Sequence, residues 1–107
     1  MGKPQYRKKL EADVEEAACQ RILLELGIFS VRLAKTSETG YPDRLFLLPR
    51  GRSLFIEFKR PGKEAREKQD LLHQRLKFFG HEVQVHATVA GAVSAVERAK
   101  CRALEAG

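Results

Sequence analysis

The chain has 107 residues, a length that suits one compact domain. Hydrophobic residues make up 43% of it, which supports a core and excludes a chain that is disordered throughout. Lys and Arg number 20 against 14 Asp and Glu, and the resulting net charge of +6 favours a polyanionic partner such as nucleic acid.

The chain shows no signal for a membrane or for an oxidising compartment. Its apolar runs fall short of the roughly 20 residues that span a bilayer. The basic start is followed by Glu11 and Asp13 rather than by an apolar signal-peptide region. The two cysteines form neither a disulfide framework nor a zinc-site spacing. We therefore expect a cytoplasmic protein with no membrane contact.

The first third of the chain predicts an arm, a helix and a strand. Residues 1–10 are basic and contain Pro and Gly, so they are expected to form a flexible arm ahead of a single domain over residues 11–107. Apolar residues recur every four positions over 11–26, which predicts a helix that ends at Gly27. Alternation over 28–35 then predicts a strand.

The middle of the chain predicts a hairpin. The segments 44–48 and 53–59 are the best strand candidates, and "PRGR" between them supplies a turn. Two strands joined by so short a turn run antiparallel, so the start of the first strand lies opposite the end of the second.

The last third predicts a helix over 64–79, a strand over 81–86 and a final helix capped by Thr88. The order is therefore α-β-β-β-α-β-α. The strand-helix-strand unit allows a right-handed crossover and a parallel strand pair beside the antiparallel hairpin. We expect an α/β fold with one mixed sheet flanked by helices.

The second hairpin strand, "SLFIEFK", carries charged residues on one face only. Side chains alternate across a strand, so Leu54, Ile56 and Phe58 point one way while Glu57 and Lys59 point the other, about 7 Å apart along the chain. The hairpin pairing brings Asp43 toward Glu57.

Two explanations fit these charges. Two carboxylates that approach each other in a half-buried site repel, and a divalent cation removes the repulsion. Mg²⁺ prefers oxygen ligands and keeps waters for substrate phosphates, and a nearby lysine suits an anionic substrate, as metal-assisted phosphodiester hydrolysis requires. Alternatively, Glu57 and Lys59 form a solvated ion pair and Asp43 is a turn residue.

The extended pattern favours the first explanation. The segment "GYPDRLFLLPRGRSLFIEFKRPGKEAREKQ", residues 40–69, contains "PD" and "EFK" and resembles the VRR-NUC (virus-type replication-repair nuclease) domain of the PD-(D/E)XK nuclease superfamily. That family's pattern runs G-x-P-D, a strand, E-x-K, a Pro-Gly turn and a helix with Gln. Small domains of this type occur in phages and bacteria. The resemblance covers about residues 11–90 and implies a restriction-endonuclease-like core.

The resemblance implies a role for each matching residue. Asp43 and Glu57 match metal ligands, with the main-chain carbonyl of Phe58 as a further ligand. Lys59 matches the residue that positions the attacking water and stabilises charge on the phosphate. Gln69 matches the helix glutamine of the catalytic set. Its helical stripe with Leu72, Leu76 and Phe79 also predicts that its amide faces inward, although a glutamine taken by itself is more typical of a helix surface. The implied cofactor is Mg²⁺ or Mn²⁺.

The family also places a glutamate on its first helix, where "EADVEE" offers three candidates. Glu11 and Glu15 lie four residues apart on the side of the apolar stripe, so either could face the site as a catalytic residue or metal ligand, whereas Glu16 points away. We favour Glu11 because the family pattern places a Glu three residues before the first apolar helix position. Acidic residues in a first helical turn are also ordinary partners of the helix dipole.

Basic and aromatic residues near the motif are expected to bind DNA with little sequence preference, although Arg50 and Arg52 are equally well explained as turn residues. Tyr41 stacks on a base or sugar, or else packs on its own loop. The three histidines have no metal-site spacing, so we expect surface or packing roles for them. The expected DNA-binding residues are Lys35, Tyr41, Arg44, Arg50, Arg52, Arg60 and Lys63, and the histidines are His73, His81 and His86.

The function implied is that of a metal-dependent endonuclease acting on branched DNA in repair or recombination. The resemblance points to a Holliday-junction resolvase acting as a homodimer, because two equivalent cuts in a four-way junction need two chains. A helicase partner is left open. The alternatives are a flap or single-strand-end nuclease of the same family, a restriction-type enzyme, or a non-catalytic basic module that binds nucleic acid.

Overall fold

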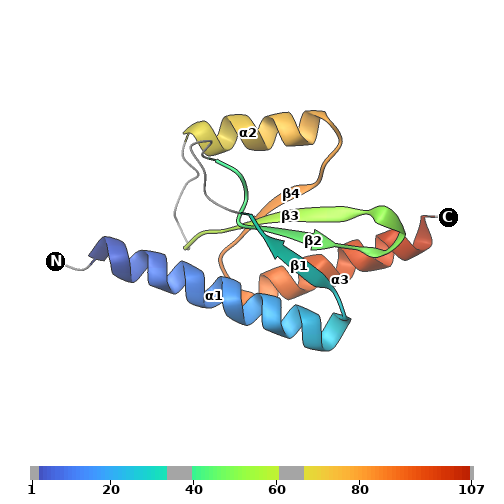
Figure 1. The fold of residues 1–107 in the computed structure, drawn as a ribbon, viewed down its shortest axis with the longest axis horizontal. Coiled ribbons are helices and arrows are strands. Elements are labelled where there is room, and N and C mark those ends of the chain that lie inside the picture. Colours follow the sequence, from blue (N-terminus) through green and yellow to red (C-terminus); the bar gives the residue numbers. More distant parts are fainter. Residues whose placement is uncertain (1–2, 34–39, 61–66, 107) are drawn as a thin grey trace.

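The fold was analysed in a computed structural model, which describes residues 3–33, 40–60 and 67–106 and the side chains of residues 10–33, 40–60 and 70–106. Within these ranges the chain forms three helices, four strands and one short 3₁₀ turn (Figure 1). In chain order they are α1 (Lys3–Leu26), β1 (Phe29–Arg32), β2 (Arg44–Leu47), η1 (Pro49–Gly51), β3 (Ser53–Phe58), α2 (Glu67–Phe78), β4 (Val83–His86) and α3 (Val89–Glu105).

The four strands form one mixed sheet in the order β1-β2-β3-β4. β1 pairs with β2 and β2 with β3 in antiparallel fashion, whereas β3 and β4 are parallel and are connected through α2. A parallel pair needs such a crossover, because the chain must return to the same end of the sheet. The expected element order and mixed α/β sheet are confirmed.

The first helix is longer than the sequence pattern predicts. α1 begins at Lys3, so helical backbone occupies most of the stretch expected to be a flexible arm over residues 1–10. Pro4 lies in the first turn, where its missing N–H breaks no intrahelical hydrogen bond. The Lys, Arg and Gln residues that follow are good helix formers, and no glycine or second proline interrupts them before Glu11.

The core lies between one face of the sheet and the pair α1 and α3. In Figure 1 both helices pass on the same side of the sheet, and α2 lies on the other side. β2 and β3 contribute large apolar side chains to this inner face, and α3 contributes a stripe of small ones that allows close packing. The fully buried members are Ala18, Ile22, Phe46, Leu54, Ile56, Ala92, Val96 and Ala103.

The outer face of the sheet keeps apolar side chains in contact with solvent. By the register, Phe29 pairs with Leu47, and Val85 pairs with Glu57. Phe29 is 66% exposed, and Leu47 and Val85 are each nearly half exposed. Phe78, the last residue of α2, is 85% exposed, and Phe79, which was expected to face inward, lies just after the helix and is 70% exposed. An apolar surface of this kind is typical of a contact with another macromolecule.

Helix ends and turns use the expected residues. Thr88 caps α3, since its hydroxyl accepts a hydrogen bond from the Gly91 amide at 3.0 Å. Gly27 ends α1 at a φ of 68°.

Cys19 and Cys101 are both free. In the part of the chain described, no helix is long and apolar enough to cross a membrane.

Candidate active site

The pairing of β2 with β3 sets Asp43 beside Glu57. Arg44 lies opposite Ile56, so the next step of this antiparallel register places Asp43 opposite Glu57. Opposite residues in an antiparallel pair project from the same face, with Cβ atoms about 5 Å apart. The ladder continues to this point on the other side as well, because the Leu33 amide donates to the Asp43 carbonyl at 3.1 Å. Both carboxylates therefore emerge from the outer face at the open end of the hairpin.

The loop ahead of Asp43 has the backbone that its sequence favours. Gly40 has a φ of 102°, which residues with a side chain rarely adopt, and Pro42 is buried. The Asp43 carboxylate accepts a hydrogen bond from the Phe58 amide at 2.8 Å. The N–H and C=O of one strand residue point to the same edge. The Phe58 carbonyl is therefore directed toward Asp43 as well, as a shared ligand set would require.

Lys59 and Glu57 form an ion pair that is largely shielded from water. The Lys59 ammonium lies 3.3 Å from Glu57 Oε2, and the two side chains are 13% and 3% exposed. A solvated pair on an open sheet face would show far greater exposure. Burial strengthens the interaction between these charges and makes their desolvation costly. Such a buried arrangement is more typical of a functional site than of surface solubility.

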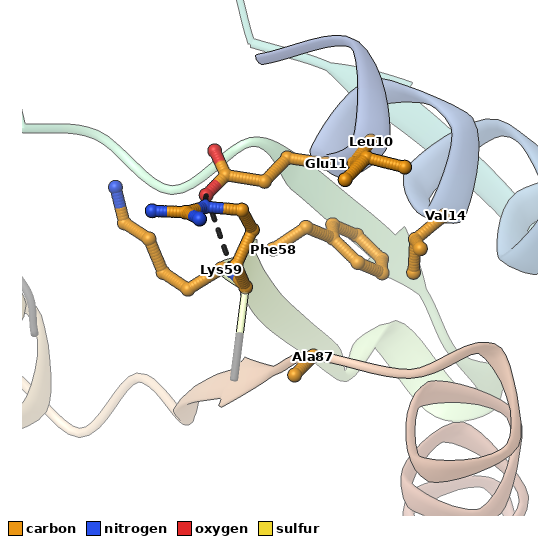
Figure 2. A pocket seen from close by; sticks show the side chains of 7 residues that line it. Leu10, Glu11, Val14, Phe58, Lys59 and Ala87 are labelled. Atoms are coloured by element: carbon orange, nitrogen blue, oxygen red, sulfur yellow. Dashed lines mark hydrogen bonds and ion pairs between the residues drawn. The ribbon is translucent and has the colours of Figure 1, made fainter. Parts of the chain in front are cut away.

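Glu11, and not Glu15, reaches toward this end of the sheet. Its carboxylate accepts a hydrogen bond from the Arg60 amide at 3.1 Å and lies 3.8 Å from Arg60 Nε. Figure 2 shows Glu11 and Lys59 at the polar side of a pocket of about 350 Å³ whose other wall is apolar. The pocket is lined by Leu10, Glu11, Val14, Phe58, Lys59, Arg60 and Ala87.

Glu15 instead holds Arg44, which was expected to bind DNA. Arg44 Nε lies 2.6 Å from Glu15 Oε2, and a second nitrogen lies 3.6 Å from Glu16. Burial lowers the pKa of Arg44, but the hydrogen bond to Glu15 and the nearby acidic charges outweigh it, so the pKa stands above its usual value. Arg44 is on the inner face of β2, where Phe46 is also buried, and it forms an intramolecular pair there. Its phosphate contact stays a prediction.

Arg50 and Arg52 do not bracket the site. Arg50 lies in the turn of the hairpin and Arg52 directly after it, whereas Asp43 and Glu57 lie at the open end, about 17 Å away at ~3.4 Å per strand residue. Arg50 donates to the Ala106 carbonyl at 2.8 Å and so ties the turn to the end of α3. A hairpin separates in space residues that are close in sequence, so Arg50 and Arg52 lie far from Asp43 and Glu57, and their contact with DNA stays a prediction.

The remaining predicted residues divide into two groups. Tyr41 precedes β2 and Arg60 follows β3, so both lie at the open end of the hairpin. Tyr41 is 38% exposed, and Arg60 is half-buried beside Glu11. Lys35 and Lys63 lie outside the described residues. Gln69 belongs to α2, but its side chain also lies outside the described part of the structure.

Sequence reasoning missed His73. This α2 residue is only 6% exposed, and it interacts electrostatically with Lys59 and Asp43. Desolvation, together with the charges of Lys77 and Lys59, lowers the pKa of its imidazole. The available signal was its spacing, since His73 follows Gln69 by four residues and so shares the helix face that carries that glutamine.

The donors at this end of the sheet suit a hard divalent cation. Two carboxylates and a main-chain carbonyl are oxygen ligands, and Mg²⁺ is usually held by one or two carboxylates with waters completing its shell. Among the described side chains, no three His, Cys, Asp or Glu residues gather around one point.

Comparison with solved structures decides the family. A chain described as "VRR_NUC domain" superimposes with a TM-score of 0.72 and 28% identity, covering 82% of this chain and 95% of that one. A second chain, described as "VRR_NUC domain protein", matches with a TM-score of 0.65 and 17% identity over 81% of this chain and 84% of that one. This second match shows a similar fold and nothing more. This chain belongs to the VRR-NUC domains.

A curated phage protein is also similar to this VRR-NUC chain. "Putative nuclease p44" of Acyrthosiphon pisum secondary endosymbiont phage 1 is 36% identical over 61 residues, which make up 57% of this chain and 66% of that protein. This chain thus spans about two thirds of the relative's length. No family model matches the sequence. The mixed sheet with Asp43, Glu57 and Lys59 at one end is the part of this VRR-NUC domain that its PD-(D/E)XK pattern predicted.

Proposed function

We propose that this VRR-NUC domain is a divalent-metal-dependent nuclease that hydrolyses phosphodiester bonds in DNA. The observation that carries the proposal is the β2–β3 register, which puts Asp43 and Glu57 on one face with Lys59 3.3 Å from Glu57. The nuclease name of the phage relative and the VRR-NUC fold support the same reaction class.

Each residue has a distinct task in this proposal. Asp43, Glu57 and the Phe58 carbonyl hold Mg²⁺ or Mn²⁺, with Glu11 as the first-helix acid. The cation supplies Lewis-acid polarisation of the phosphodiester and a more acidic water. Lys59 donates hydrogen bonds to the attacking water or to a phosphate oxygen, and its positive charge offsets the charge that develops on the phosphate. Gln69 serves the same site from α2.

The proposed substrate is branched DNA, with the four-way junction first. The net charge of +6 supports a polyanionic substrate. Arg60 and Tyr41, at the open end of the hairpin, are the proposed DNA contacts within the described residues, together with Lys35 and Lys63 from the rest of the chain. The short strands and turns of this domain offer little surface for reading base sequence in a groove, so shape is the better basis for selection.

A homodimer accompanies the junction proposal. One domain carries one site, and symmetric nicking of a four-way junction needs two. The exposed apolar residues Phe29, Leu47 and Val85 on the outer sheet face support a second copy as the occupant of that surface.

The proposal is tested by a cleavage panel of four-way junction, flap, splayed arm and linear duplex, with Mg²⁺ or Mn²⁺ and with EDTA. We expect nicking of the junction with metal and none with EDTA. Glu57→Gln and Lys59→Met should each lower the rate by at least 10²-fold while keeping DNA affinity. Glu97→Gln, which changes an exposed glutamate on α3, is the matched control and should cleave at the wild-type rate.

The panel also separates the alternatives. Preferred cleavage of flaps or splayed arms would replace the resolvase assignment with the flap-nuclease alternative. Salt-sensitive binding without cleavage of any substrate would indicate a non-catalytic module. Full activity of Glu57→Gln would remove the metal site from the mechanism.

A further inference from the structure

His73 is buried at a position where burial is energetically unfavourable. It lies in the middle of α2 and is 6% exposed. Its Nε2 atom is shielded from solvent and has no hydrogen-bond partner among the described residues. A buried polar atom without a partner destabilises a fold, and leucine or methionine would fill the same space without that penalty. The imidazole therefore calls for an explanation other than packing.

The charged neighbours of His73 place it at the proposed site. Asp70 and Lys77 belong to its own helix, whereas Asp43 and Lys59 come from the hairpin across the outer face of the sheet. Burial is the main cause that lowers the pKa of the imidazole, so the ring is neutral near pH 7. A neutral ring can carry its proton on Nε2 and donate one hydrogen bond from that atom.

The geometry argues against a metal-ligand role for the ring. The side chains of Asp43, Glu57 and His73 are all described. Among the described side chains, no three His, Cys, Asp or Glu residues gather around one point where they could hold a metal ion. Among the described residues no group accepts a hydrogen bond from this buried nitrogen, and an acceptor that arrives with the substrate would satisfy it. Nucleic acid brings phosphate oxygens, which accept hydrogen bonds from neutral donors as well as from cations.

We propose that His73 is a phosphate-binding residue, with Nε2 donating to a non-bridging oxygen of the bound strand at or next to the scissile phosphate. The inference rests on the proposed nuclease function and adds a substrate contact from α2 to it. Lys59 and His73 then approach the same stretch of backbone from β3 and from α2, and α2 becomes one wall of the strand-binding site.

The test compares His73→Leu and His73→Gln with wild type. Leucine keeps the bulk and removes the donor, and glutamine keeps an N–H donor of similar reach. His81→Leu, at an exposed histidine just beyond α2, is the matched control. We expect His73→Leu to unfold at the wild-type temperature or above it and to lose roughly 10- to 100-fold in single-turnover cleavage. His73→Gln should recover part of the rate, and His81→Leu should match wild type.

A chemical readout separates phosphate contact from support of the fold. Substrates carry one neutral methylphosphonate at each of the phosphates around the cut in turn. At one position the methylphosphonate should slow cleavage by wild type. It should cause no further loss of rate in His73→Leu, because that variant already lacks the contact. Equal losses for both proteins at every position, or wild-type cleavage by His73→Leu, would overturn the inference.

Failure of the proposed function is recognised separately. If wild type cuts no substrate, junction affinity is measured in Ca²⁺ by fluorescence anisotropy. Weaker binding by His73→Leu, partly restored in His73→Gln, would keep the phosphate contact while ending the nuclease proposal. Equal affinity would end the inference as well. If His73→Leu does not fold, the methylphosphonate comparison is made with His73→Met, which also lacks the N–H donor, and the same rule applies.

Discussion

Replacing Arg44 distinguishes a structural ion pair from a DNA contact. In the fold, Arg44 Nε lies 2.6 Å from Glu15 Oε2, and Arg44 Nη1 lies 3.3 Å from Ser30 Oγ. Arg44→Met removes the main partner of a carboxylate that is only 10% exposed. Breaking a buried pair from one side typically costs about 3–5 kcal/mol. Arg32, 3.6 Å from the same oxygen, remains as a weaker partner.

The expected loss is therefore about 2–3 kcal/mol of unfolding free energy, or roughly 10–20 °C in Tm for a domain of this size. Urea unfolding at neutral pH measures it. The double variant Glu15→Leu/Arg44→Met removes both charges and should regain most of the loss, since no unpaired charge stays buried. The control is Arg21→Met, which breaks the exposed pair with Glu25 and should cost about 0–1 kcal/mol.

The same proteins are compared for DNA affinity at a temperature where each is folded. We expect Arg44→Met to bind DNA as wild type does, with an unchanged salt dependence. A stability change below about 0.5 kcal/mol, together with weaker DNA binding and a salt slope reduced by about one, would refute the reasoning. Arg44 would then be a phosphate contact that leaves Glu15 when DNA binds.

Three further predictions concern the metal, pH and assembly. Mg²⁺ or Mn²⁺ at tenfold its Kd should stabilise wild type by about 1.4 kcal/mol, seen as a higher Tm, and Asp43→Asn should lose this shift. Burial, then the charge of Arg98, lowers the pKa of His86 below its ordinary 6.5. As the pH is lowered, His86 in the unfolded chain therefore takes up a proton at a higher pH than His86 in the folded chain. The free energy of unfolding is thus highest above pH 6.5 and decreases as the pH falls. The Tm of wild type should drop more between pH 7.5 and 5.5 than that of His86→Leu, and equal drops would contradict this cause. Leu47→Lys should convert a dimer to monomer in light scattering, whereas Leu104→Lys, at an exposed leucine on α3, should not.

The sequence predicted the parts of the fold that depend on short-range patterns. The alternation of "SLFIEFK" placed Leu54, Ile56 and Phe58 on the buried face, and the short turn fixed the hairpin pairing that brings Asp43 to Glu57. The extent of α1 was underestimated, because a run of basic residues carries no apolar periodicity even though it favours helix.

The roles of the arginines depended on tertiary contacts that no local pattern records. Arg44 follows Asp43 directly in the motif, yet alternation sends its side chain to the opposite face, where α1 presents Glu15. The choice between Glu11 and Glu15 depended on the same fact. Once Glu15 is held by Arg44, Glu11 is the acid on α1 that reaches the backbone just after Lys59.

His73 shows why site residues on a crossover helix are hard to find from one sequence. A histidine among leucines is typical of a helix face that packs against the fold, and the neighbouring Leu72 and Leu76 are indeed half-buried. Its importance follows only from placing α2 on the sheet face opposite α1 and α3, where Asp43 and Lys59 also emerge. That face bears the charges of the proposed reaction next to exposed apolar residues such as Val85. A second copy of the chain that covers the apolar part would leave the charged end open to DNA, so catalysis and assembly are compatible on one surface.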